Sequence, residues 1–330
     1  MRLTVIIPTY NRAASLRKTL DSLSAATLPP GLEVNVIVVD NNSTDNTSQV
    51  AEEMASQFVE VGFRYLFEPR QGRSFAVNSG LRTADGDLIS TIDDDEQIDK
   101  NWYIEIHKIF NDRWEEVDFV GGKILPNLEA DPPTWIEPLK EGALCWRDFG
   151  DHEWRYDKNS PMITGAHGIF KKSTFDRIGL YNEALGVKGK GFLGGEDEVF
   201  YDQLIEAGFQ GIYHPKLVVY HDVPARRLTK AFYRRWLIGV GMSRRLADLH
   251  YKPIPGTRLF AIPRWMFKWA AGGFFQLVKF TLTGDEEKAL DAENKPLVFI
   301  GFFYATHIEG GWLDNRVLNL VRQWGRSVSR

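Results

Sequence analysis

The sequence predicts an α/β protein built on a mostly parallel sheet flanked by helices, with a C-terminal helical extension. Over the first 125 residues, short β-rich runs alternate with segments in which apolar residues recur at helical spacing. This alternation is typical of βαβ units. Residues 34–39 form an apolar run dominated by β-branched side chains, as expected of a strand buried on both faces. The last third of the chain has long helical patterns.

The elements of the first half follow in order along the chain. A first strand is predicted at residues 3–7, and a turn follows it. Leu16, Leu20 and Leu23 then recur at i, i+4 and i+7, which is the spacing of one apolar helix face. The pattern continues with a strand at 34–39, a helix at 46–57, a strand at 63–67, a helix at 73–84 and a strand at 88–92.

Regular structure weakens beyond Gly122, where a segment rich in Pro and Trp predicts long loops over residues 126–161. A helix with Ser173 as its N-cap comes next. The remaining predictions are a Gly-rich stretch at 186–195, a helix at about 196–207, strands at 211–213 and 217–220, and helices at about 228–249 and 257–282. We therefore expect a domain at 1–225, with halves 1–125 and 126–225, and an extension at 226–330.

The composition excludes several classes of protein. The chain has 330 residues, of which 43% are apolar and 25% charged, so it is an ordered globular protein. The single Cys145 excludes a disulfide framework and a multi-cysteine zinc site. The net charge of −4 hides an asymmetry, because residues 1–225 carry 22 Lys+Arg against 36 Asp+Glu, and residues 226–330 carry 18 against 8. The two parts are expected to have different partners.

Three consecutive carboxylates, Asp93, Asp94 and Asp95, follow the predicted strand at 88–92. Side chains alternate along an extended backbone, so we expect Asp93 and Asp95 to point one way and Asp94 the other. Two convergent carboxylates suit Mg²⁺ or Mn²⁺ shared with phosphate oxygens. A solvated acidic loop is the alternative, but open α/β sheets bind ligands at strand ends.

Two further sites have candidate chemistry. Gly194 and Gly195 precede Glu196 and Asp197, which lie in the first turn of a predicted helix. The helix dipole stabilises acidic side chains at this position. Alternatively, one of the two carboxylates is a general base. His221 ends the predicted strand at 217–220. Its imidazole could complete the coordination of a metal, although a lone histidine is more often structural.

Other motifs are rejected. Residues 189–194 fit G-x-G-x-x-G, but no strand precedes them, so the dinucleotide interpretation fails. There is no Walker motif, no nucleophile elbow and no nucleic-acid recognition motif. We therefore expect no nucleic-acid partner.

Several short motifs occur in a defined order over about residues 3–225. The order is residues 5–12, residues 38–45, Gly72-Arg73 with residues 76–80, the triple Asp, Gly165-Ala166, residues 170–172, Ile178-Gly179 and residues 195–197. The ordered set resembles the family 2 glycosyltransferases, which are inverting enzymes with the GT-A fold. His167 departs from the pattern, since the family often has Asn at that position.

The resemblance implies a metal-dependent inverting glycosyltransferase. Such an enzyme moves a sugar from a nucleotide-diphosphate donor, with a UDP-sugar expected, to a saccharide or lipid-linked acceptor in polysaccharide or glycolipid biosynthesis. It implies that Asp197 is the catalytic base, that Glu196 contacts the acceptor and that Asp40 meets the nucleotide base. It also implies that Asp95 binds Mn²⁺ or Mg²⁺, with Asp93 near the ribose and the metal, and His221 as a further ligand.

The residues themselves agree with this assignment. Tyr10 can stack on a base, Arg12 or Arg73 can meet phosphate, and Trp154 offers a flat face to a sugar ring, with core packing as its alternative role. The residues assigned to the nucleotide sugar are Pro8, Thr9, Tyr10, Arg12, Asp40, Asn42, Arg73, Asp93 and Asp94.

Two other functions remain open. A nucleotidyltransferase of sugar phosphates normally begins with a Gly-rich basic loop, which residues 8–11 do not form. A catalytically inactive sugar-binding scaffold is the other, and the presence of Asp197, His221 and the triple Asp together argues against it.

The basic, aromatic tail has three candidate roles. Residues 264–269 alternate basic and aromatic side chains, so a helix here could lie on an anionic membrane, pack on the catalytic domain or form a homo-oligomer. Apolar stretches at 269–278 and 297–305 are shorter than the roughly 20 residues of a membrane span. The N-terminus lacks the apolar run of a signal peptide. We expect a cytoplasmic protein, with peripheral membrane contact as one of the tail's roles.

Overall fold

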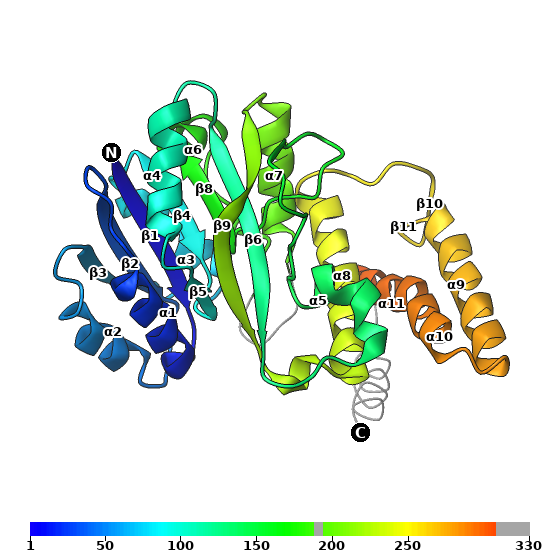
Figure 1. The fold of residues 1–330 in the computed structure, drawn as a ribbon. Helices are drawn as coiled ribbons and strands as arrows, with labels where there is room; N and C mark the ends of the chain where they lie inside the picture. Colours follow the sequence, from blue (N-terminus) through cyan, green and yellow to red (C-terminus); the bar gives the residue numbers. More distant parts are fainter. Residues whose placement is uncertain (188–193, 308–330) are drawn as a thin grey trace. The chain divides into compact units, whose positions relative to one another are not determined.

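The computed structural model describes residues 1–187 and 194–307 (Figure 1). The chain divides into two compact units, and each is described separately. The first unit comprises residues 1–129, 144–183 and 196–223, and the second comprises 130–143, 184–195 and 224–330. The sequence placed one boundary at residue 225, whereas the structure also assigns two earlier segments to the second unit.

A nine-stranded mixed sheet forms the centre of the first unit, with the strand order β3-β2-β1-β4-β8-β6-β9-β5 and β7 paired to β9. Strands β1 to β4 are parallel, as the sequence predicts. Antiparallel β8 pairs with β4 and β6. The strands are β1 (Arg2–Thr9), β2 (Glu33–Asp40), β3 (Gly62–Phe67), β4 (Leu88–Ile92), β5 (Glu96–Ile98), β6 (Phe119–Leu128), β7 (Trp154–Arg155), β8 (His167–Lys171) and β9 (Gly211–Val223).

Helices cover both faces of this sheet (Figure 1). Successive side chains of a strand face opposite sides, so Val5 and Ile7 of β1 enter one core cluster and Ile6 enters the other. The first cluster includes side chains of α1 (Ala13–Ala25), α2 (Thr47–Ala55) and α4 (Trp102–Arg113). The second includes side chains of α3 (Arg73–Thr83), α6 (Lys172–Ile178) and α7 (Glu196–Glu206).

Two local predictions are wrong. Residues 211–213 and 217–220 are not separate strands but parts of β9, whose register against β6 shifts between Gly121 and Lys123. Ser173 is not the N-cap of α6, because the helix begins at Lys172 and is capped by Lys171 without a side-chain hydrogen bond. Lys172 donates its backbone N–H to the Asp87 carbonyl oxygen at 2.9 Å. A long-range contact thus accompanies the start of this helix.

The second unit is mainly helical. Its long helices are α8 (Lys230–His250), α9 (Arg264–Leu282) and α11 (Asn294–His307). A Cβ on Gly301 would lie 2.0 Å from the Ile238 carbonyl oxygen, and one on Gly241 would lie 2.0 Å from that of Val298. The crossing of α8 and α11 therefore requires both glycines. The smaller elements are η1 (Thr134–Leu139), α5 (Lys140–Ala143), η2 (Ala225–Arg227), β10 (Arg258–Leu259), β11 (Ile262–Pro263) and α10 (Glu286–Ala292).

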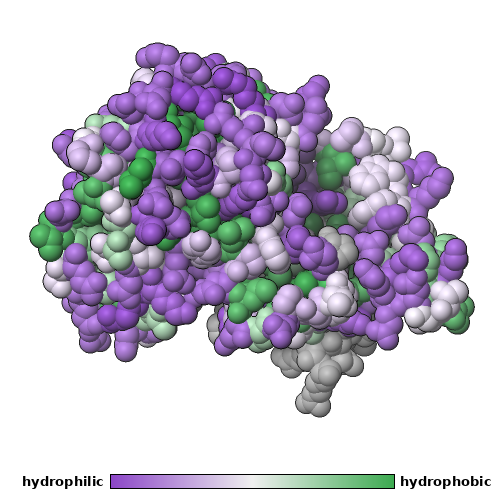
Figure 2. Space-filling view, viewed as in Figure 1, coloured by the Kyte–Doolittle hydropathy of each residue, from purple (hydrophilic) through white to green (hydrophobic). Residues whose placement is uncertain are grey.

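Hydrophobic residues are scattered in small patches over the face seen in Figure 2. Among the helices of residues 1–187 and 194–307, none combines the length and the apolar composition that crossing a bilayer needs.

Candidate active site

Three adjacent parallel strands end at one edge of the sheet in the first unit. Thr9 at the end of β1 pairs in register with Asp40 at the end of β2. On the other side of β1, β4 ends at Ile92, directly before the triple Asp. Ligands of open α/β sheets bind at this kind of edge, so the sequence-predicted residues gather where the fold favours a site.

Asp40 is a buried carboxylate held in a fixed orientation. One oxygen accepts the Ser43 backbone N–H at 2.8 Å, and the other accepts the Tyr65 hydroxyl at 2.7 Å. Burial and the negative charge of Asp40 raise the pKa of Tyr65, so the tyrosine stays a donor. Asn42 is exposed and left-handed, with φ at 64°. The end of β2 therefore carries a preoriented acceptor.

Arg12 forms ion pairs with two members of the triple Asp. Its Nη1 atom lies 2.9 Å from Asp94 Oδ1 and 2.6 Å from Asp95 Oδ2. Thr9 donates its hydroxyl to the other oxygen of Asp94 at 2.8 Å. Burial raises the pKa of Asp94 to about 7, although Arg12 opposes the shift.

The expected alternation of the three carboxylates is wrong. Asp94 and Asp95 both reach Arg12, whereas Asp93 reaches Arg73. The alternation applies to extended backbone, and β4 has already ended at Ile92. The following residues form a turn, in which the Glu96 N–H donates to the Asp93 carbonyl at 3.2 Å.

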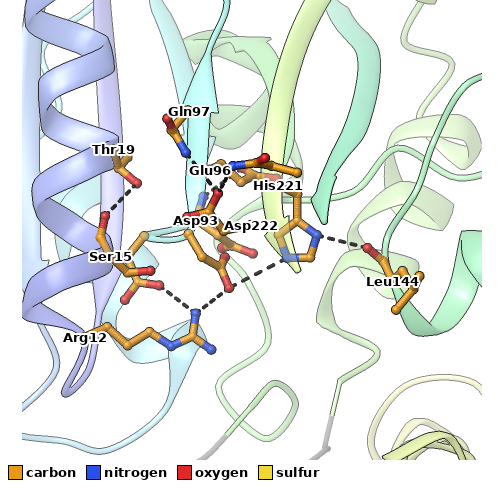
Figure 3. Close-up of polar contacts among 12 residues, drawn as sticks. Arg12, Ser15, Thr19, Asp93, Glu96, Gln97, Leu144, His221 and Asp222 are labelled. Atoms are coloured by element: carbon orange, nitrogen blue, oxygen red, sulfur yellow. Dashed lines mark hydrogen bonds and ion pairs between the residues drawn. The ribbon is translucent and has the colours of Figure 1, made fainter. Parts of the chain in front are cut away.

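His221 of β9 points its imidazole towards the Leu144 carbonyl (Figure 3). Its Nδ1 atom lies 2.9 Å from the Leu144 carbonyl oxygen, which can only accept, so Nδ1 carries the hydrogen. In the neutral ring Nε2 then carries a lone pair that can coordinate a cation. This atom lies 3.7 Å from Asp95 Oδ2. A lone pair facing a carboxylate suits a cation between them, and a backbone carbonyl is a common partner of the outer nitrogen of a metal-binding histidine.

The carboxylates do not form a complete metal cage. Within the described ranges, no group of three or more His, Cys, Asp and Glu side chains is arranged to hold a metal ion. Asp93, expected near the metal, is bound instead to Arg73. A cation at Asp95 and His221 would therefore take its other ligands from water or from a bound phosphate, as Mg²⁺ commonly does.

Arg73, in the first turn of α3, connects the two acidic motifs. Its Nε and Nη2 atoms donate to Asp93 Oδ1 at 3.1 and 3.0 Å. Its Nη1 atom lies 3.5 Å from Glu196 Oε1 and 3.5 Å from Asp197 Oδ1. Gly72 before it has φ at 144°, a conformation that glycine adopts readily. The loop after β4 and the start of α7 thus share one cation.

Glu196 and Asp197 begin α7, as the sequence predicts. A Cβ on Gly165 would lie 2.3 Å from Asp197 Oδ1, so that glycine leaves room for the carboxylate. Burial raises the pKa of Asp197, while the positive charge of Arg73 opposes the shift. Burial and the neighbouring Asp197 raise the pKa of Glu196 to about 7. Glu196 can therefore hold a proton near neutral pH, and the pKa of Asp197 lies above its ordinary value.

The remaining predicted residues are Pro8, Tyr10 and Trp154. Pro8 is buried within β1 opposite Val39, and Tyr10 is half-buried. The Trp154 ring is part of an aromatic cluster, stacked on Tyr213 with centroids 5.1 Å apart and edge-on to Tyr156 at 4.7 Å. This packing matches the alternative role of Trp154 in the core.

His167 lies in the interior and not among the carboxylates. Trp102 donates its indole N–H to His167 Nε2 at 2.9 Å. Burial lowers the pKa of His167 to about 3, so the ring is neutral. Its role in this structure is to accept a hydrogen bond from a buried tryptophan.

The sequence missed three polar residues of the site. Tyr65 fixes Asp40, and Asn41 accepts the Gly72 N–H at 2.7 Å. Glu96 accepts the Asp93 N–H at 3.0 Å. Glu96 extends the acidic run and was visible as a fourth carboxylate, whereas the contact of Tyr65 depends on β2–β3 pairing that no local pattern reveals.

Comparison with known proteins identifies the family. The family model described as Glycosyl transferase family 2 matches residues 4–179. The chain belongs to glycosyl transferase family 2. The family predicted from the ordered motifs is confirmed.

A curated relative supports this assignment. Glycosyltransferase GlyA of Streptococcus pneumoniae serotype 4 is 31% identical over 81% of this chain. The chain spans only 37% of the length of GlyA.

Solved glycosyltransferases of low sequence identity share the fold. S. aureus TarS 1–349 in complex with UDP-GlcNAc has a TM-score of 0.54 and 15% identity, covering 90% of this chain and 91% of that one. The mannosyltransferase PcManGT from Pyrobaculum calidifontis, in complex with GDP-Man and Mn²⁺, has a TM-score of 0.54 and 19% identity, covering 99% and 82%. The GT-A fold predicted from the sequence is confirmed.

Proposed function

We propose that this glycosyltransferase transfers a sugar with inversion from a nucleoside diphosphate donor, and that Asp197 is its general base. One observation carries the proposal: Arg73 binds Asp93 on the donor side and lies 3.5 Å from Asp197. A single base and a charged donor site connected in this way suit direct displacement, which needs no enzyme nucleophile.

The donor's base is proposed to meet Asp40. This carboxylate is buried and oriented by Ser43 and Tyr65, and an acceptor of this kind suits an N–H group of a nucleobase. Thr9, Tyr10 and Asn42 flank it at the same strand ends. A UDP-sugar is the donor we favour, since TarS is solved with UDP-GlcNAc. A guanosine donor is the alternative, since PcManGT is solved with GDP-Man.

Asp95 and His221 are the residues proposed to hold Mn²⁺ or Mg²⁺. The oxygen and nitrogen atoms face each other at 3.7 Å, and the Leu144 carbonyl orients the imidazole. A bound divalent ion would neutralise the charge that develops on the departing diphosphate. Arg12 adds a fixed positive charge on the same carboxylate.

Asp197 takes the proton of the acceptor hydroxyl as that oxygen attacks the anomeric carbon. Arg73 holds Asp197 in place and keeps its pKa from rising further. Glu196, whose pKa is raised to about 7, can donate a hydrogen bond to the acceptor while protonated. The acceptor is proposed to be a saccharide or a lipid-linked saccharide of a polysaccharide or glycolipid pathway, presented at the cytoplasmic face of a membrane.

A donor-consumption screen tests this function. The full chain is incubated with a panel of nucleotide sugars, in Mn²⁺, in Mg²⁺ and with a chelator. We expect one donor to release nucleoside diphosphate only with a divalent ion, and Asp197→Asn to suppress transfer. Release of sugar 1-phosphate would instead indicate a nucleotidyltransferase, and turnover of no donor would favour the sugar-binding scaffold.

A further inference from the structure

An exposed apolar surface lies in the second unit, on α9 and on the hairpin of β10 and β11. Of the fourteen large hydrophobic residues that are exposed in the described part of the chain, seven fall between residues 259 and 282. They include Phe260 at the hairpin turn and Phe275 and Leu282 on α9. Scattered exposed apolar residues are ordinary, but such a concentration marks an interaction surface.

The helix α9 has two different faces. Met266, Ala270 and Gly273 are buried within the second unit. On the opposite side, Phe275 is 72% exposed and Leu282 is 82% exposed. Positions three and four residues apart share one side of a helix. The outward apolar row, called here the α9 stripe, consists of Ala271, Phe275, Val278 and Leu282.

Basic side chains accompany the α9 stripe. Arg264, Lys268 and Lys279 lie on α9 and are exposed, and α9 contains no Asp or Glu. Along α9 itself, the apolar side chains are therefore accompanied by positive charge only, and the acidic residues Asp285, Glu286 and Glu287 begin after the helix has ended. This combination is complementary to an anionic lipid surface.

The hairpin turn holds an aromatic ring outward in a strained backbone. Phe260 is 66% exposed, and the left-handed φ angles are 51° for Phe260 and 61° for Ala261. Such turns favour Asn and Gly, and a bulky side chain is disfavoured in this conformation. The next residue, Ile262, is fully buried, so the turn is anchored from beneath while Phe260 faces outward.

Hydrogen bonds and ion pairs to the buried Asp248 fix this turn. Asp248 accepts hydrogen bonds from Arg258 Nη1 and Nη2 at 2.8 and 2.6 Å, from Arg245 at 2.5 Å and from the Ile254 N–H at 2.6 Å. Arg258 also donates to the Ala261 carbonyl at 3.1 Å. The exposed ring thus sits on a rigid support.

We propose that the α9 stripe and Phe260 form the surface that docks on an anionic lipid bilayer, with the apolar side chains among the headgroups and Lys268 and Lys279 facing lipid phosphates. A second copy of the chain is the less favoured occupant, because apposed α9 helices would bring their basic residues together. This proposal rests on the membrane contact named in the proposed function and specifies the surface that makes it. It depends on none of the catalytic assignments.

Sedimentation with vesicles tests the surface. The full chain is mixed with vesicles of phosphatidylcholine alone or with added phosphatidylglycerol, without donor or metal. We expect binding to the anionic vesicles only, and weaker binding as salt is added. Phe275→Ser with Leu282→Ser, and separately Lys268→Glu with Lys279→Glu, should each lower the partition coefficient by about tenfold or more, since each basic residue near the surface contributes about 1 kcal/mol. Val59→Ser, exposed on the first unit, is the matched control.

Three outcomes would overturn the proposal. They are no binding to anionic vesicles, equal loss in the Val59→Ser control, or a concentration-dependent dimer that the α9 variants dissociate. The thermal midpoint of every variant checks that it is folded. Nucleotide binding by the same preparations is scored separately, so that a failed membrane test and a failed catalytic assignment are distinguishable.

Discussion

Arg73 is the residue on which the candidate site depends most. The sequence predicts it as a phosphate contact, and the structure surrounds it with Asp93, Glu196 and Asp197. Sequence motifs identified each of these groups, because each stands at a strand end or a helix start. Their meeting at one guanidinium could not be predicted, since Arg73 and Glu196 are far apart in the chain and only the folded sheet brings them together.

Replacing Asp197 by Asn should separate binding from chemistry. The substitution keeps the shape of the side chain and removes the proton acceptor. We expect donor affinity to stay nearly unchanged and transfer to fall by about 10²-fold or more, the usual worth of a general base. Glu198→Gln is the control, because it removes one negative charge from an exposed residue in the same helix turn. It shows how much of the effect comes from losing a charge that interacts with the helix dipole. Near-normal turnover of Asp197→Asn would disprove the assignment.

Replacing Asp95 by Ala should abolish metal-dependent nucleotide binding. His221 alone cannot hold the bridging cation against water. Titration of the nucleoside diphosphate with and without Mn²⁺ measures the effect. Asp222→Asn is the control, because that carboxylate binds Lys18 at 2.8 Å instead. If the mutant keeps its metal-dependent affinity, Asp95 is not a ligand.

The pH dependence of transfer should report Asp197. Burial raises its pKa in the folded protein, and only the ionised carboxylate can act as base. Activity therefore falls as pH drops through this raised pKa. Arg73→Gln removes the opposing positive charge, so the acid limb of kcat/KM should move to higher pH, whereas Arg73→Lys should leave it near its original place. An acid limb at the same pH in both variants would exclude this coupling.

At the level of elements, the sequence predicts the first half well and the second half less well. Local periodicity identifies β1 to β4 and their helices, because buried parallel strands and amphipathic helices have distinct patterns. It fails at β9, whose continuity depends on pairing with β6. It also fails near residue 257, where the predicted helix is preceded by the β10–β11 hairpin. Asp248 stabilises that hairpin from the preceding helix.

Ser243 of α8 is expected to position the loop before the catalytic pair. Its hydroxyl accepts the Gly194 N–H at 2.8 Å and donates to the Gly239 carbonyl at 2.9 Å. Ser243→Ala removes both hydrogen bonds, and the one to the Gly194 loop is worth about 1 kcal/mol. We expect kcat to fall by about fivefold with an unchanged KM for the donor. Thr306→Val, which loses only an intrahelical bond to Phe302, is the control, and equal effects of both variants would reduce Ser243 to a structural role.

The whole molecule combines two compact units whose chain segments are interleaved. The polypeptide passes between them five times, and two segments of the second unit are inserted into the sequence of the first. The core clusters of the first unit contain only its own residues. Connectivity therefore links units whose cores are separate.

Thermal unfolding should consequently occur as one transition. Gly301→Ala introduces a Cβ 2.0 Å from the Ile238 carbonyl and should lower its midpoint. Gly272→Ala, where a Cβ meets nothing within 4 Å, should raise the midpoint slightly, because alanine is favoured over glycine in a helix by about 1 kcal/mol. Nucleoside diphosphate with Mn²⁺ binds the folded form, so it should raise the thermal midpoint of the unsubstituted protein and of both glycine variants. Scanning calorimetry measures these shifts. Two resolved transitions, with the ligand moving one and Gly301→Ala the other, would show that the units unfold independently despite their interleaved chain.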